Sequence, residues 1–291
     1  MWTKLFRAEW RKIIGNRWAT GCMIWIFPAL AILVTILALL AAAFSSSFRE
    51  GLSLAPALWT DMAISPWFIP NNPLGRGLLL GFTAVLFAGE YQWNTWKSIV
   101  PRSQRVPLIL VKFFTVALFV VFAFTLMSIL LTLGWGLVSL AAGAPYGPSF
   151  GSDVLADFAK DYGLQMLYAF VSTIIAAGIA ALAAMLTRSI LGSVITGIVI
   201  TIGETMLALP LAILAWMLDM DSIMHIYRFL PSYNLLNLFV WLNGETPGGF
   251  EMPSGEMVFD SQLFNEAVLV CWVIGLIALT AYLFQRQDIT N

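Results

Sequence analysis

Carboxylates in apolar surroundings are the side chains of this sequence best suited to chemistry. Glu204 ends a row of small and polar residues, Ser193, Gly197 and Thr201, spaced at intervals of three or four. That spacing places all of them on one face of a helix. Because a charge near the centre of a bilayer costs about 3 kcal/mol, such a glutamate is expected to face protein or water. The face predicts either the lining of a transport route or a packing surface in which Glu204 is protonated and bonds a neighbouring helix.

A second candidate is residues 90–107, a polar, aromatic and basic segment between two apolar runs. The segment is too polar to lie in lipid and too short to form a domain, so we expect it at the membrane surface. Helices on either side would move it rigidly, as in an element that passes force between a membrane domain and a soluble partner. The candidate contact residues are Glu90, Trp93, Thr95, Trp96, Lys97, Ile99, Pro101 and Arg105, with the two tryptophans and Ile99 as exposed apolar contacts.

Residues 2–14 predict an amphipathic helix with basic residues on one side, which by itself suits an anchor on anionic lipid. Glu9 does not suit lipid, because it lies between Phe6 and Ile13 on the apolar side. Burying its carboxylate without a partner would cost several kcal/mol. We therefore expect a partner among the cations of the chain. The candidates are Lys97, Arg102, Arg105 and Lys112, and Arg105 is favoured because a guanidinium holds a carboxylate bidentately.

The composition indicates that these residues sit in a membrane protein. Of the 291 residues, 60% are hydrophobic and 11% are charged, whereas soluble domains have about 25% charged residues. A spanning helix needs about 20 apolar residues. An interface helix (1–17) is expected before an all-α membrane domain (18–291) of six spans, with short re-entrant helices in an outer segment (219–262). The spans are predicted at 18–44, 74–89, 108–140, 164–186, 190–218 and 263–284.

The basic residues set the orientation of these spans. With both termini in the cytosol, the cytosolic segments hold eleven of the 15 basic residues, which satisfies the positive-inside rule. Arg76 falls at the outer end of the short second span, where its side chain is expected to extend towards the outer surface. The eleven residues are Lys4, Arg7, Arg11, Lys12, Arg17, Lys97, Arg102, Arg105, Lys112, Arg188 and Arg286.

The sequence contains no set of residues that would make it an enzyme. It has one histidine and no phosphate-binding Gly-x-x-x-x-Gly-Lys-Ser/Thr loop. We therefore expect no catalytic residue, bound cofactor or metal in this chain. Any ATP hydrolysis, with its Mg²⁺, would belong to another polypeptide.

The whole chain resembles the six-helix permease subunits of ABC-2-type ABC transporters. These families have a glutamate at the end of the second span, a Gly-Thr pair, a Pro-x-Ser-Arg-like turn and a lysine that opens the third span. The ends of the chain fit as well, with Glu9-x-x-Lys12 and Phe284-x-Arg286-x-Asp288-Ile289. Asn94 stands where glycine is common, and one extra residue separates Ser103 from Arg105. The matching series here is Glu90, Asn94-Thr95, Pro101-x-Ser103-x-Arg105 and Lys112.

The resemblance implies a half-transporter in a prokaryotic cell membrane that pairs with a second permease subunit, identical or a paralogue. Two cytosolic ABC ATPases would contact the interface helix and the segment after the second span. Spans two and five would line the route. A hydrophobic or amphipathic substrate, such as a peptide, suits the apolar interior, and no nucleic acid is expected. The competing class is a stand-alone transporter driven by protons through Glu204, although the sequence has no inverted repeat.

Overall fold

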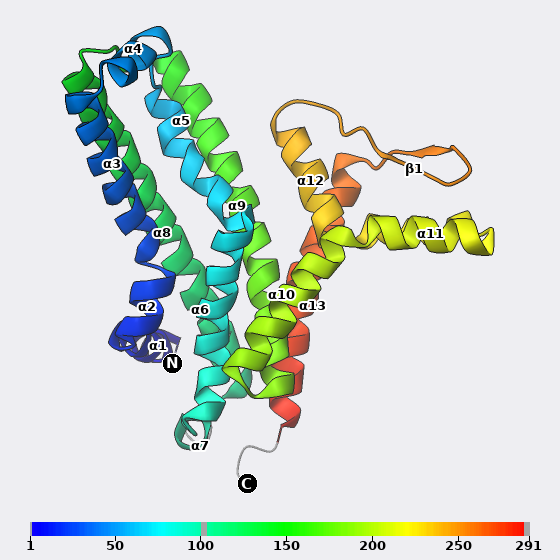
Figure 1. Cartoon of the computed structure of the whole chain (residues 1–291). Coiled ribbons are helices and arrows are strands. Elements are labelled where there is room, and N and C mark those ends of the chain that lie inside the picture. The colour runs from blue at the N-terminus through cyan, green and yellow to red at the C-terminus, as the bar shows by residue number, and fades with distance from the viewer. Residues whose placement is uncertain (1, 100–103, 288–291) are drawn as a thin grey trace.

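The computed structural model describes residues 2–99 and 104–287, and most of them are helical (Figure 1). Within these described residues, four helices are long and apolar enough to cross a membrane. They are α3 (Ile26–Phe44), α8 (Arg105–Ala142), α9 (Ser152–Thr187) and α13 (Gln262–Arg286). The pair α10 (Ile190–Met206) and α11 (Ala208–Leu218) adds a fifth crossing if it is counted as one span. The predicted all-α fold with several possible membrane spans is therefore confirmed at this level.

The second predicted span corresponds to α6 (Pro73–Gln92), which does not reach the apolarity of the other spans. It carries Arg76 and Glu90 near its two ends. Asn72 caps the helix by accepting a hydrogen bond from the Leu74 backbone nitrogen at 3.1 Å, and Pro73 occupies a first-turn position that suits proline. Because α9, α10 and the 3₁₀ helix η1 (Ser65–Asn71) pack around α6, much of it is covered by protein.

The first and fifth predicted spans are not single straight helices, which corrects the prediction from apolar runs. The first is divided into α2 (Arg17–Met23) and α3, and it follows the amphipathic α1 (Trp2–Gly15). The fifth bends by 55° between α10 and α11. Pro210 explains the second break, because it lacks the N–H that would bond the carbonyl of Met206. Figure 1 shows α11 leaving the bundle sideways.

Close backbone contacts hold the long helices together. α3 packs along α8, and α9 lies between α6, α10 and α13 (Figure 1). A Cβ atom at Gly134 of α8 would lie 2.1 Å from the Thr35 hydroxyl oxygen of α3. Likewise, a Cβ at Gly178 of α9 would lie 2.7 Å from the Leu276 side chain of α13. Small residues therefore set the helix separation at both contacts.

The connections at the far end from α1 are structured. Between α3 and α6 lie α4 (Ser46–Leu54), α5 (Trp59–Ile64) and η1. The expected short helices of residues 219–262 are present as η3 (Asp221–Phe229) and α12 (Pro231–Leu242), which packs on α13. The hairpin β1 (Phe250–Glu251) and β2 (Met257–Val258) follows, with Phe250 opposite Val258. The Arg228 guanidinium binds the Asp260 carboxylate at 2.5 Å beside this hairpin.

Candidate functional site

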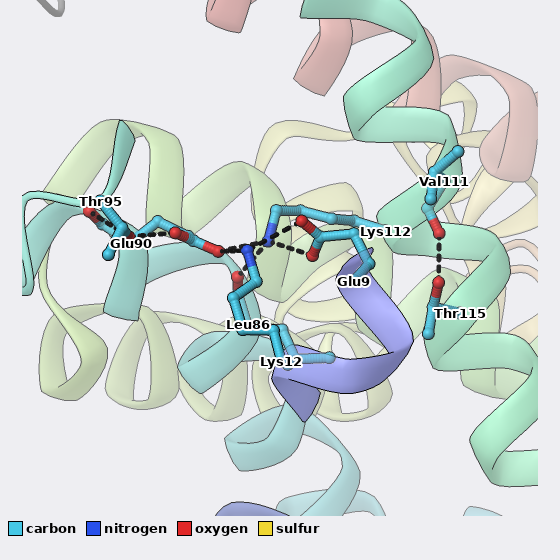
Figure 2. Close-up of polar contacts among 8 residues, drawn as sticks. All are labelled: Glu9, Lys12, Leu86, Glu90, Thr95, Val111, Lys112 and Thr115. Carbon is cyan, nitrogen blue, oxygen red and sulfur yellow. Dashed lines mark hydrogen bonds and ion pairs between the residues drawn. The ribbon is translucent and has the colours of Figure 1, made fainter. Parts of the chain in front are cut away.

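Two carboxylates and two ammonium groups meet at the end of the bundle that carries α1 and the short α7 (Trp96–Ile99) (Figures 1 and 2). We call this group the charge cluster: Glu9 and Lys12 from α1, Glu90 from the last turn of α6 and Lys112 from α8. Lys112 is 1% exposed, and both glutamates are 3% exposed. Residues separated by up to 103 positions therefore share one buried site.

Lys112 is at the centre of the charge cluster. Its ammonium nitrogen donates to Glu9 Oε2 at 3.0 Å, to Glu90 Oε1 at 2.8 Å and to the carbonyl oxygen of Leu86 at 2.9 Å (Figure 2). A lysine ammonium has three N–H donors, and all three are used here. Complete hydrogen bonding is what makes burial of a lysine tolerable, because an unpaired ammonium would be strongly disfavoured away from water.

Lys12 balances the charge at the edge of the cluster. Its ammonium donates to Glu9 Oε1 at 2.8 Å and also to Glu90 Oε1. Two positive and two negative charges then give a neutral group. The Thr95 hydroxyl donates to Glu90 Oε2, and the Thr95 backbone nitrogen donates to the Glu90 carbonyl at 3.0 Å. The cluster thus ties α1, α6, α8 and the turn that leads into α7.

The expected pairing of Glu9 inside the protein is confirmed, but the favoured partner was wrong. Lys112 holds the carboxylate, whereas Arg105 Nη1 donates to the carbonyl oxygens of Phe284, Gln285 and Gln287 at 3.2, 2.8 and 2.8 Å. The last carbonyls of a helix have no partner within it and attract cations. Arg105 therefore caps the carbonyl end of α13.

The two tryptophans of the predicted contact segment have different surroundings. Trp96 is 1% exposed, and its ring lies 4.4 Å from the Phe284 ring and 5.1 Å from the Lys112 ammonium. The prediction of Trp96 as an exposed contact was wrong, because its ring packs in the core against the Lys112 ammonium and the Phe284 ring. Trp93 is 56% exposed, and Lys97 is exposed too. Pro101 and the Ile99 side chain lie outside the described residues.

The polar stripe of α10 does form one face, as predicted, since its four residues are the buried residues of that helix: Ser193, Gly197, Thr201 and Glu204. The Ser193 hydroxyl donates to the Ala180 carbonyl of α9 at 2.7 Å. A Cβ at Gly197 would lie 3.2 Å from Leu80 of α6. Packing against α9 and α6 accounts for the first two residues, and the lining of a route stays a prediction.

Glu204 has a partner that sequence reasoning missed. Arg76 Nη2 of α6 lies 4.0 Å from Glu204 Oε1, and the Ser232 backbone nitrogen of α12 donates to Oε2 at 3.2 Å. Arg76 was expected to reach the outer surface, but its side chain is largely buried and faces Glu204. The available signal was the charge pair itself, because opposite charges on two apolar helices are stabilised by meeting.

The charge cluster and the Arg76–Glu204 contact are both ionic contacts between described residues. Among them, no group of three or more His, Cys, Asp or Glu side chains could hold a metal ion. The site is suited to joining four segments of the chain and moving them together. The chain matches no known family model, no curated protein and no solved structure.

Proposed function

We propose that this chain is the membrane subunit of an ATP-driven exporter of the ABC-2 type. Six spans with both termini in the cytosol would form half of a transporter, and a second permease subunit would complete it. α6 would act as the second span despite its two charges, because other helices cover it. Separate ATPase subunits would bind at α1 and α7 and would hold the ATP and Mg²⁺. The exported compound would be hydrophobic or amphipathic, such as a peptide, and the membrane would be that of a prokaryote.

The charge cluster is the observation that supports this proposal. An element that receives force from a partner must not slide against the helices that it drives. Lys112 and Lys12 join α1 to α6 and α8 through Glu9 and Glu90. ATP-driven closure of the partners would therefore move α1, the turn before α7 and the ends of both long helices as one body.

Trp93 provides the test, because it is the exposed tryptophan of this segment. The tagged chain is purified from its native membrane into nanodiscs, and co-purified ATP hydrolysis is measured. We expect Trp93→Ala to remove most of this activity, as loss of an aromatic interface anchor costs about 2 kcal/mol or more. Trp18→Ala, at an 82% exposed position of α2, is the matched control. Absence of ATPase from the wild-type preparation, or equal loss in both variants, contradicts the proposal.

One observation keeps a proton-driven transporter as the second candidate. Glu204 is buried, and its Oε1 accepts no hydrogen bond from a described residue, so this oxygen is available to carry a proton. Vesicles that contain the purified chain alone separate the two functions. A proton gradient should drive substrate movement without ATP in this case, and Glu204→Gln should abolish it. Movement that requires the ATPase and ATP supports the exporter.

A further inference from the structure

A cavity of about 690 Å³ opens in the half of the bundle away from the charge cluster. Its wall combines α5, η1, the first part of α9 and the end of α12, all towards the upper end of Figure 1. Small-molecule sites have volumes of about 300–1,000 Å³ and combine apolar walls with a few polar groups. The cavity therefore has the size of a site for a small organic compound, and it is separate from the charge cluster.

The rim of the cavity carries unbalanced charge. Asp61, Lys160 and Asp161 line it, and all three are exposed. None of them forms an ion pair with another residue of the part of the chain that the structure describes. Two carboxylates and one ammonium group leave one negative charge in excess. Electrostatic complementarity favours a ligand with one positive charge.

The wall of the cavity offers polar atoms that lack partners. Gln165 is 7% exposed, and its Oε1 accepts no hydrogen bond from any described residue. Trp241 also lines the cavity, and its indole N–H has no described acceptor. A buried polar atom without a partner costs free energy, which a ligand donor would recover once the Gln165 amide turns towards the cavity. The rings of Phe68 and Trp241 can cover an apolar body or face a cation.

We propose that this cavity binds a small organic monocation, in which one ammonium group is joined to an apolar or aromatic body. The ammonium would lie near the Asp61 and Asp161 carboxylates, and rotation of the buried Gln165 amide would let its Oε1 accept from the ammonium. The body would rest on Phe68 and Trp241. Binding of this kind requires only the chain itself, so it goes beyond the proposed function and is tested without an ATPase.

Three probes with the same indole ring and different charges test the proposal. The full chain is placed in phosphatidylcholine nanodiscs, and binding of radiolabelled tryptamine is measured by scintillation proximity, with empty nanodiscs as the baseline. Unlabelled tryptamine carries one ammonium group, tryptophol is neutral and indole-3-propionate is an anion. We expect saturable binding that tryptamine displaces at concentrations at least about tenfold lower than the other two, a ratio that corresponds to 1.4 kcal/mol. Equal displacement by all three probes, or signal equal to empty nanodiscs, overturns the proposal.

Matched substitutions at the rim then locate the binding site. Asp161→Asn and Asp61→Asn should each weaken tryptamine binding about tenfold, whereas Lys160→Gln should strengthen it about threefold by removing a like charge. Asp153→Asn makes the same change at another exposed position of α9 that does not line the cavity, and it should leave binding unchanged. All four positions are exposed, so the variants are expected to fold. Rim variants that bind like the Asp153 control place the ligand elsewhere and refute the assignment.

Discussion

Replacing Lys112 with methionine gives the sharpest test of the charge cluster. Methionine is similar in length and apolar, so the main losses are one positive charge and three hydrogen bonds, to Glu9, Glu90 and the Leu86 carbonyl. Glu9 and Glu90 would remain buried, with Lys12 as the only cation that the described residues place beside them. Removal of one partner from a buried ion pair costs about 3–5 kcal/mol, because the remaining charge is left uncompensated. We expect Lys112→Met to destabilise the protein by this amount.

A second substitution should recover part of that loss. Adding Glu9→Gln to Lys112→Met removes the surplus carboxylate and leaves Glu90 paired with Lys12, so the group is neutral again. Residues within one ionic network typically show coupling energies of about 0.5–3 kcal/mol. The double variant should therefore be more stable than the sum of the two single effects by about 2 kcal/mol.

The midpoint of thermal unfolding, followed by tryptophan fluorescence in detergent, measures these effects. About 1 kcal/mol corresponds to about 2 °C in a chain of this size, so Lys112→Met should lower the midpoint by about 6–10 °C. Lys160→Met makes the same change at an exposed position in the first part of α9, away from the charge cluster, and should shift the midpoint by less than about 1 °C. Strict additivity of the Glu9 and Lys112 substitutions would refute the shared site.

Three further outcomes follow from the packing and are checked by the same unfolding measurement. Trp96→Ala should lower stability by about 3–5 kcal/mol, as for other buried aromatic residues, whereas Trp93→Ala should change it by less than about 0.5 kcal/mol. Gly134→Ala should cost about 1–3 kcal/mol, because its Cβ would meet α3, whereas Gly21→Ala has open space and should cost nothing measurable. Glu204→Gln should cost about 1–3 kcal/mol, because it leaves a largely buried guanidinium without its carboxylate; an unchanged midpoint would show that the pair contributes little.

Local patterns predicted the helices and the faces that they bury. The 3.6-residue period placed Glu9 on the buried side of α1, and the spacing of the α10 stripe placed Glu204 on the buried face. Neither pattern specifies which cation pairs with each carboxylate. Lys112 and Arg105 are seven residues apart, and the topology makes them almost equally plausible partners of Glu9. Only the position of α13 decides between them. The carbonyls at the end of that helix bind Arg105, so Lys112 is the cation that pairs with Glu9.

Breaks within apolar runs could not be read from hydropathy, because both halves of a broken helix remain apolar. The run at residues 190–218 has the length of one span, yet it bends by 55° after Met206. A proline at position 210 predicts a bend or a loosened outer part of this helix, but it does not predict the direction in which α11 leaves the bundle. α11 packs against η3, so the direction of α11 depends on the position of η3. That position is itself set by tertiary contacts.

The burial of Trp96 extends the connections of the charge cluster to the last helix. Its ring contacts Phe284 of α13 on one side and the Lys112 ammonium on the other. Arg105, at the start of α8, holds the carbonyls at the end of the same helix. A force applied at the exposed Trp93 would therefore reach α13 as well as α6 and α8. Because one guanidinium nitrogen makes all three hydrogen bonds to these carbonyls, Arg105→Ala should remove them together and so loosen α13 more than α6.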